Sequence, residues 1–201
     1  GGGAVYWNGA NGTLSNCSFV NNTVKSTSNN GGAVYWNGAN GVLGNCSFVN
    51  STAGNYGGAV YWSGSNGVLS NSSFMSCSVN PLYSYAYGGA IYASNATFYA
   101  GRDNFTNNQG YSYTEGGAIY LDYTNDVEIE WCEFTNNKAA VGGAICLMDS
   151  TFKVTNTTSH NNGEFIHAYF AGKGSHFADC ENDDKIFSIE ILLLFSELVL
   201  S

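Results

Sequence analysis

Residues 31–50 read GGAVYWNGANGVLGNCSFVN, and close copies of this stretch recur along the 201-residue chain. One motif, Gly-Gly-Ala-(Val/Ile)-Tyr, begins at Gly2, Gly31, Gly57, Gly88 and Gly116, and it returns at Gly142 with Cys in place of Tyr. A second motif, Phe-x-x-Asn or a close variant, begins at Phe19, Phe48, Phe74, Phe105 and Phe134. Copies that recur every 26 to 31 residues are typical of a solenoid, in which each repeat forms one coil.

The spacing from the first motif to the second is nearly fixed, whereas the spacing from the second motif to the next copy varies. The first Gly precedes the Phe by 17 residues in four copies and by 18 in the fifth. From that Phe to the next Gly the separations are 12, 9, 14, 11 and 8 residues. Residues that face a core must keep register, but an outward loop can change length at little cost in free energy. We therefore expect the variable segments to be loops that leave every coil at the same corner.

Within the fixed segment, apolar residues alternate with the period of a β-strand. Three short strands per coil account for the pattern: one over Gly-Ala-Val-Tyr-Trp, one around a Leu position and one over Cys-x-Phe. The inward position of the first strand holds Val5, Val34, Val60, Ile91, Ile119 and Ile145. That of the second holds Leu14, Leu43, Leu69, Ala100, Ile129 and Val154. The sequence thus predicts an all-β fold, a parallel β-helix of about six coils over residues 1–162, with coils about 4.8 Å apart.

Asparagines recur at the corner between the second and third strands, at Asn16, Asn45, Asn71 and Asn156. We expect their amides to hydrogen-bond to one another as a buried ladder along the axis. Asn-x-Ser/Thr sequences, which are acceptors of N-glycans in exported proteins, begin at Asn11, Asn16, Asn21, Asn45, Asn50, Asn71, Asn95, Asn104 and Asn156. In a chain rich in Asn and Ser most of them arise by chance, and Asn16, Asn45 and Asn71 are expected to be inaccessible in the ladder.

The repeat register fails near Gly163, so residues 163–201 are expected to form either a cap on the last coil or an irregular segment. The chain opens inside a repeat, which predicts that it is a piece of a longer solenoid. The apolar run over residues 186–200 is interrupted by Glu190 and Glu197 and is too short to span a bilayer comfortably. Any attachment to a membrane is therefore expected through regions outside this segment.

Charge excludes one class of partner. The net charge is −9, and the six basic residues are scattered along the chain. Nucleic-acid binding relies on a basic patch that releases counterions, so nucleic acid is not a predicted partner. All 15 acidic residues lie after residue 100.

The pairing of Gly-Gly-Ala-Ile with Phe-x-x-Asn resembles the repeats of chlamydial polymorphic outer-membrane proteins. The fuller unit, Gly-Gly-Ala-Val-Tyr-Trp-Asn-Gly followed by Cys-Ser-Phe-Val-Asn-Asn, is more similar to adhesin-like surface proteins of gut methanogenic archaea. The resemblance covers residues 1–162 and implies a right-handed β-helix, displayed outside the cell or on its wall and used for attachment. The general bias of parallel crossovers favours the same hand. The resemblance supplies no catalytic residues.

Tyrosines provide two candidate binding surfaces. Tyr6, Tyr35, Tyr61, Tyr92 and Tyr120 follow the inward Val/Ile position and should point outward as a stacked column. This column is either a platform for sugar rings or, as we favour, a set of rings that shield the sheet by stacking on each other. The variable loops carry Tyr56, Tyr83, Tyr85, Tyr87, Tyr111 and Tyr113. Gathered at one edge, they are the candidate site for a glycan or a partner-cell surface protein, unless they fold back over the solenoid.

The sequence predicts neither a cofactor nor a metal site. His167, His176 and Cys180 are too loosely spaced to favour zinc. The cysteines of neighbouring coils share a core position whose spacing does not suit a disulfide, and they are expected to act as small buried residues. These cysteines are Cys17, Cys46 and Cys132. Asp103 occupies the same position in another coil, and we expect it to form a local ion pair with its neighbour Arg102.

An enzyme is the main alternative, since many parallel β-helices cleave polysaccharides. Asp126, Glu128 and Glu130 alternate on one strand face, so neighbouring carboxylates lie about 7 Å apart, a separation that suits an inverting glycosidase. Lys153 falls beside Glu128 one coil later, which favours a surface ion pair. The sequence therefore predicts a non-enzymatic extracellular segment for attachment or display, with a purely structural spacer and a polysaccharide-active enzyme as alternatives.

Overall fold

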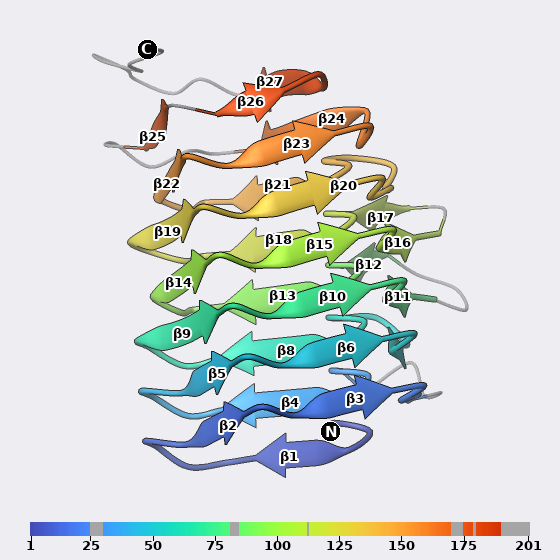
Figure 1. The fold of residues 1–201 in the computed structure, drawn as a ribbon, viewed down its shortest axis with the longest axis vertical. Coiled ribbons are helices and arrows are strands. Elements are labelled where there is room, and N and C mark those ends of the chain that lie inside the picture. The colour runs from blue at the N-terminus through green and yellow to red at the C-terminus, as the bar shows by residue number, and fades with distance from the viewer. Residues whose placement is uncertain (25–29, 81–84, 112, 170–174, 179, 190–201) are drawn as a thin grey trace.

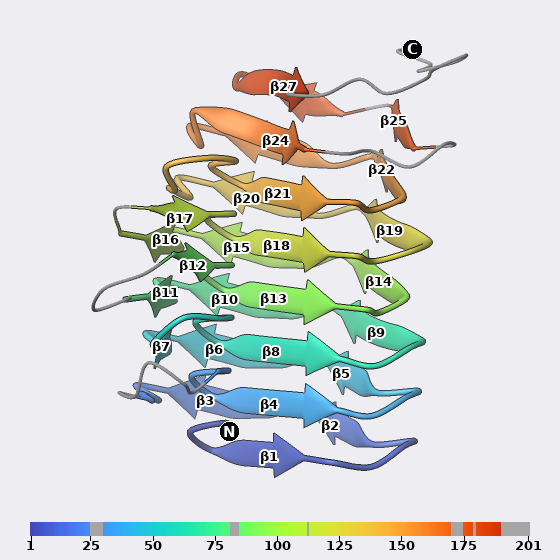
Figure 2. The same cartoon turned by 180° about the vertical axis from the view of Figure 1, so that it is seen from behind.

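The protein is a rod of stacked coils in the computed structural model, which describes residues 1–24, 30–80, 85–111, 113–169, 175–178 and 180–189. The chain rises from β1 to β27 as a right-handed coil, and each coil contributes one strand to each of three parallel sheets (Figures 1 and 2). The described residues contain no helix, and so none that is long and apolar enough to cross a membrane. The predicted all-β right-handed parallel β-helix is confirmed.

The three sheets follow the three predicted strand positions. The first sheet comprises β1 (Val5–Trp7), β4 (Val34–Asn37), β8 (Val60–Ser63), β13 (Ile91–Ser94), β18 (Ile119–Asp122), β21 (Ile145–Met148), β24 (Glu164–Ala168) and β27 (Lys185–Ile189). The second comprises β2 (Thr13–Ser15), β5 (Val42–Gly44), β9 (Gly67–Ser70), β14 (Phe98–Gly101), β19 (Val127–Glu130), β22 (Phe152–Thr155) and β25 (His176–Ala178). The third comprises β3 (Ser18–Val20), β6 (Ser47–Val49), β10 (Ser73–Met75), β15 (Asn104–Thr106), β20 (Glu133–Thr135), β23 (Thr158–His160) and β26 (Glu181–Asn182).

The interior consists of columns of like side chains, in the register that the repeat predicted. Val5 pairs with Val34, Leu14 with Leu43, and Phe19 with Phe48. The phenylalanine rings at residues 19, 48, 74, 105 and 134 stack with centroid separations of 4.7, 4.7, 4.9 and 4.8 Å. A second stack, of the Trp side chains at residues 7, 36 and 62, has separations of 5.1 and 5.2 Å. Because each apolar ring covers the next, burial along the axis is continuous.

The Gly-Gly-Ala motif is required by backbone geometry at the start of each coil. From the second copy of the motif to the sixth, the first glycine has a positive φ, +61° at Gly57, a backbone conformation that other residues rarely adopt. The second has no room for a Cβ atom, because at Gly58 that atom would meet the backbone of the next coil. The alanine that follows, Ala59, is fully buried. The motif therefore marks the point at which successive coils approach most closely.

The corner asparagines do not form the predicted buried ladder. Asn16, Asn45 and Asn71 have φ values of 55°, 54° and 50°, and all three side chains are exposed. Asn tolerates this left-handed backbone better than other non-glycine residues, so it is selected here for the bend. The prediction that these three residues are inaccessible is therefore wrong. Exposed amide pairs do form at other corners, as between Asn40 and Asn11 at 2.9 Å.

The stack does not stop at the boundary predicted near residue 162. β24 pairs in parallel with β21, β25 with β22, β26 with β23, and β27 with β24. Here Ser159 takes the position of the core phenylalanines, and Phe177 extends the column of Leu positions. Because these side chains differ from those of the earlier coils, the repeat motifs did not reveal that the register continues. Residues 190–201, on which part of the predicted cap or irregular segment falls, lie outside the described residues.

Candidate functional site: the loop edge

The variable loops leave the rod along one edge, as the spacing predicted. They are seen beside the third sheet in Figure 1 and from behind in Figure 2, where the strands of two small sheets project from the main stack. The first small sheet comprises β7 (Thr52–Ala53), β11 (Ser78–Val79) and β16 (Gln109–Gly110), and the second comprises β12 (Ala86–Tyr87) and β17 (Thr114–Glu115). Ala53, Val79 and Ala86 form a small apolar cluster beneath them. The bases of the loops are therefore ordered by the same stacking that orders the coils.

A column of buried asparagines fixes the point where the loops depart. Asn137 is fully buried, and its Nδ2 donates to the carbonyl of Phe105 at 2.9 Å and to Oδ1 of Asn162 at 2.9 Å. Asn108 donates in the same way to the carbonyl of Phe74 and to Oδ1 of Asn137. Each amide thus satisfies a buried carbonyl and one neighbour in the column, which removes the penalty for unpaired polar groups.

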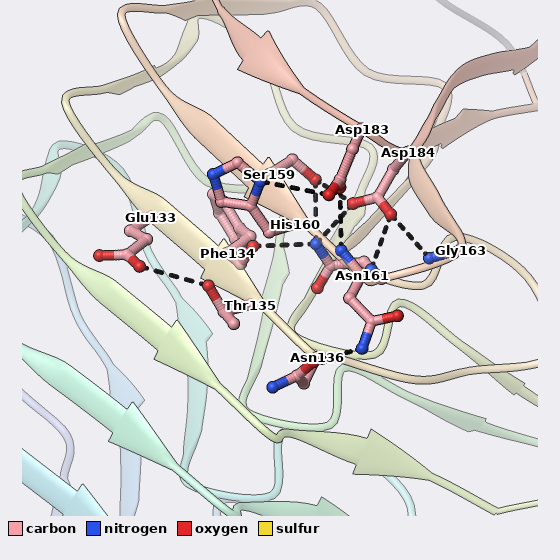
Figure 3. Close-up of polar contacts among 11 residues, drawn as sticks. Glu133, Phe134, Thr135, Asn136, Ser159, His160, Asn161, Gly163, Asp183 and Asp184 are labelled. Atoms are coloured by element: carbon pink, nitrogen blue, oxygen red, sulfur yellow. Dashed lines mark hydrogen bonds and ion pairs between the residues drawn. The ribbon is translucent and has the colours of Figure 1, made fainter.

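The last amide of this column, that of Asn162, donates to Asp184, and Figure 3 shows the polar contacts around the Asp184 carboxylate. This carboxylate accepts hydrogen bonds from the hydroxyl of Ser159 at 2.6 Å and the backbone N–H of Gly163 at 3.0 Å, and from Nδ2 of Asn162 at 2.8 Å. Burial raises the pKa of Asp184, but these hydrogen bonds outweigh it and hold the pKa below its ordinary value. The amide dipoles point their N–H ends toward Asp184, so a negative charge there is favourable.

Three of the predicted loop tyrosines lie on the surface of this edge. Tyr85, Tyr111 and Tyr113 are 59%, 53% and 68% exposed. The rings of Tyr85 and Tyr113, from successive loops, meet edge to face with centroids 5.9 Å apart. Tyr113 has a φ of 68°, an unfavourable conformation for a bulky residue, and its loop is closed by a hydrogen bond from Thr114 N–H to the Tyr111 carbonyl. The backbone therefore holds this ring outward at a cost in strain.

The other loop tyrosines do not join this group. Tyr56 and Tyr87 are half-buried and stack on each other at 5.6 Å, and both pack against the rings of Tyr92 and its neighbours in the first sheet. Burial and the nearby Glu115 raise the pKa of Tyr87 to about 12. Tyr83 lies outside the described residues. Of the six predicted loop tyrosines, three are thus exposed, two fold back over the solenoid and one lies outside the described residues.

The column of tyrosines on the first sheet is a stack rather than a platform. Neighbouring rings from Tyr6 to Tyr120 are nearly parallel, with centroids 4.6–5.7 Å apart, so they cover each other's faces. Tyr6 is 60% exposed, whereas Tyr92 and Tyr120 are buried, which agrees with the favoured expectation that the rings stack on each other and shield the sheet. Tyr92 donates to Asp122 at 2.6 Å, and burial raises its pKa. The column offers ring edges, not faces, to a ligand.

The acidic strand of the enzyme alternative is tied into surface contacts. Glu128 forms an ion pair with Lys153 at 2.5 Å, as the sequence predicted, and this contact raises the pKa of the Lys153 ammonium. Glu130 accepts the hydroxyl hydrogen of Tyr99 at 2.8 Å, and that bond raises the pKa of Tyr99 to about 12. Asp126 is exposed at a corner with a φ of 52°. Two of the three carboxylates therefore have defined partners on the second sheet.

The cysteine position forms a hydrogen-bonded column through the core. Cys17, Cys46 and Cys132 are free thiols. Every other residue described at this position donates to the carbonyl two residues earlier in its own coil, at distances of 2.9–3.4 Å; these donors are Cys17, Cys46, Ser72, Cys132, Thr157 and Cys180. The exception is Asp103, because an ionised carboxylate has no hydrogen to donate. The expectation of small buried thiols holds for Cys46 and Cys132.

Asp103 does not pair with Arg102, contrary to the sequence prediction. Arg102 is exposed at a left-handed corner, whereas Asp103 is 2% exposed. Its Oδ1 accepts the backbone N–H of Ser72 at 2.8 Å, and its buried Oδ2 has no hydrogen-bond partner. Burial raises the pKa of Asp103 to about 7. The sequence identified the unusual residue but not its environment, because consecutive residues at this corner point to opposite sides of the coil wall.

Among the described residues, no group of three His, Cys, Asp or Glu side chains is placed to hold a metal ion. His167 and His176 lie on β24 and β25, in different sheets. Nδ1 of His167 contacts Glu164 at 3.3 Å inside its own strand. Cys180 donates to the carbonyl of Ala178.

The comparisons with known proteins agree with this architecture. No curated protein and no solved structure matches the chain. One family model matches residues 2–182, well over half of the sequence, and its description is a right-handed β-helix region. The match extends beyond the six copies of the glycine motif and includes most of the additional strands. The chain belongs to the right-handed β-helix family.

Proposed function

We propose that this chain is an attachment segment of a surface protein, in which a rigid β-helix displays the loop edge to a partner. The observation that carries the proposal is the gathering of exposed Tyr85, Tyr111 and Tyr113 at the one edge where loop length is free to vary. Tyrosine gives a large contact area with few rotatable bonds, together with a hydroxyl that can donate or accept. We propose a glycan or a protein of a partner cell as the ligand.

The location that fits this role is extracellular, on the cell surface or cell wall. The likeness of the repeats to adhesin-like surface proteins of methanogenic archaea and to chlamydial outer-membrane repeats supports it. Many thin coils joined by continuous hydrogen-bonded sheets form a stiff support, which suits display at a distance from the cell. Membrane attachment would be supplied by regions outside this segment. A purely structural spacer is the alternative if the loop edge binds nothing.

We propose no catalytic role for the acidic strand. The ion pair of Glu128 and the hydrogen bond to Glu130 support a surface role for those carboxylates. A reducing-sugar assay on pectin and related glycans tests this, with Glu130→Gln as the matched variant. Release of sugar that is lost in Glu130→Gln would establish the enzyme alternative.

A glycan array combined with a cell-binding assay tests the attachment function. The test variant replaces Tyr85, Tyr111 and Tyr113 with Ser; the control replaces Tyr6 and Tyr123, which are 60% and 56% exposed but belong to the first sheet and the corner that follows it. We expect the test variant to lose the cell binding, or at least one array glycan, that the control keeps, with unchanged far-ultraviolet circular dichroism in both. Equal binding by both variants would refute the role of the loop edge.

A further inference from the structure

The outer face of the second sheet changes character along the rod. At one outward position the register places Val42 and Val68 in the early coils, followed by Tyr99, Glu128 and Lys153. At the next outward position small residues give way to Glu130, and at the following corner the asparagines of the early coils give way to Arg102 and then to Trp131. Outward positions of a solenoid are free of packing demands, so a local concentration of aromatic and charged groups there calls for a functional reason.

The ring of Tyr99 lies along its own strand, β14, over Gly101. A Cβ atom on Gly101 would meet Cζ and Cε1 of the Tyr99 ring at 2.6 and 2.7 Å, so the glycine leaves the space that the ring occupies. The Tyr99 hydroxyl is held at its far end by Glu130. The ring is half-buried, with its inner side on the strand backbone. Unlike the stacked rings of the first sheet, it is not covered by another aromatic ring from a neighbouring coil.

Two adjoining hollows extend along the axis on this face. One, of about 200 Å³, is lined by Asn66, Val68, Thr97, Tyr99, Asp126 and Glu128. The other, of about 290 Å³, shares Asp126 and Glu128 and continues to Thr151 and Lys153. Together they make an open groove parallel to the axis, with an aromatic ring in its wall and amide, hydroxyl and carboxylate groups beside it.

The charge of the groove limits what it can hold. Asp126 and Glu128 contribute two carboxylates to its lining, against the single ammonium of Lys153, which is already paired with Glu128. The whole chain carries a net charge of −9. A polyanion would be repelled, whereas an uncharged or cationic chain would not.

From these features we infer that the groove is a binding site for a linear glycan without acidic groups. The apolar face of a pyranose ring would stack on Tyr99, and its hydroxyls would donate to Asp126 and Glu128. A chain lying along the axis would meet similar polar groups about every 4.8 Å, the separation of the coils. This site is on a different face from the loop edge and does not depend on the function proposed for that edge.

Isothermal titration calorimetry with three oligosaccharides of matched length tests the site. The probes are cellohexaose, which is neutral, a chitosan hexamer, which is cationic, and hexagalacturonate, which is anionic. We expect binding of cellohexaose or of the chitosan hexamer, and none of hexagalacturonate. Absence of binding by both non-acidic probes up to millimolar concentration, or equal binding of hexagalacturonate, would overturn the inference.

Variants identify the residue responsible. Tyr99→Ala should weaken binding about tenfold or more, because it removes the ring on which the sugar stacks. Gly101→Ala keeps the ring but displaces it from the sheet, and should weaken binding as well. Tyr123→Ala is the matched control, since that exposed tyrosine lies outside the groove. Unchanged affinity in Tyr99→Ala would overturn the assignment. The loop-edge serine variant should retain cellohexaose binding, which separates this site from the attachment function.

Discussion

Replacement of Asp103 by Asn should remove a pH dependence from the stability of the rod. The other residues described at this core position donate a hydrogen to the carbonyl two residues earlier, as Thr157 does to Thr155 at 2.9 Å. By analogy with these residues, a neutral Asp103 would donate from Oδ2 to the carbonyl of Gly101, whereas an ionised Asp103 has no hydrogen to donate. Asparagine has the same shape, and it supplies an acceptor for the N–H of Ser72 and a permanent donor for the carbonyl.

The magnitude follows from the pKa of Asp103, which burial raises from 3.8 to about 7 in the folded protein. Each unit of difference corresponds to about 1.36 kcal/mol, so the full effect is about 4 kcal/mol. Because the folded pKa is the higher one, the unfolded chain loses its proton first as the pH rises. The contribution of Asp103 is therefore fully present below about pH 4 and is lost progressively until about pH 7.

Urea unfolding at pH 4 and pH 8, followed by circular dichroism, measures this effect. At pH 4 the free energies of unfolding of the protein and of Asp103→Asn should agree within about 1 kcal/mol. At pH 8 the variant should be the more stable by about 4 kcal/mol. Asp149→Asn is the control, since Asp149 is exposed and its replacement should give no such difference between the two pH values. A difference between Asp103→Asn and the protein that is the same at both pH values would refute the reasoning.

Three further substitutions test the stacking itself, each by the midpoint of thermal unfolding. Gly58→Ala should prevent folding or lower the midpoint strongly, because the added Cβ meets the backbone of the neighbouring coil. Gly44→Ala is the control and should be neutral, since its Cβ would lie 3.4 Å from its nearest neighbour. Similar midpoints for the two variants would contradict this account. Asn137→Ala should lower the free energy of unfolding by about 3 kcal/mol, because it leaves a buried carbonyl and a buried N–H unpaired. The control, Asn125→Ala, replaces an exposed residue and should change the free energy of unfolding by less than about 0.5 kcal/mol. A small effect at Asn137 would show that the buried amide column contributes little. Phe48→Ala should cost about 3–5 kcal/mol, since the ring is fully buried between two others, and a loss below about 1 kcal/mol would mean that the stack is not the core.

The loop edge illustrates how far sequence reasoning reaches for a site. Variable spacing correctly indicated that the loops share one corner, and Tyr85, Tyr111 and Tyr113 are exposed there. It could not show that Tyr56 and Tyr87 pack on the first sheet, because that depends on contacts between a loop and rings of other coils. On the second sheet the sequence pointed only to carboxylates for an enzyme alternative, and it did not reveal the groove that we propose as a binding site. Its signal was present in the register, in the change from Val68 to Tyr99 to Glu128.

The sequence by itself determined which residues stack on which. A fixed separation between motifs forces equivalent residues of successive coils into one column, so Phe19, Phe48 and the Val and Leu positions could be aligned before any coordinates. The same repeat predicted three strands per coil and one corner for the loops. These features follow from periodicity alone, because hydrogen bonding between parallel strands admits one register for a given spacing.

Only the tertiary structure decided which polar residues face inward at the corners. Left-handed backbone at Asn16, Asn45 and Asn71 turns their side chains to solvent, while Asn137, one residue beyond such a corner, is buried. It also decided that the coils continue past Gly163, where the side chains change but the pairing does not. The physical reason is the same in both cases: periodicity assigns a residue to a column, but the local backbone angle and the packing of neighbouring coils decide whether that column lies inside or outside.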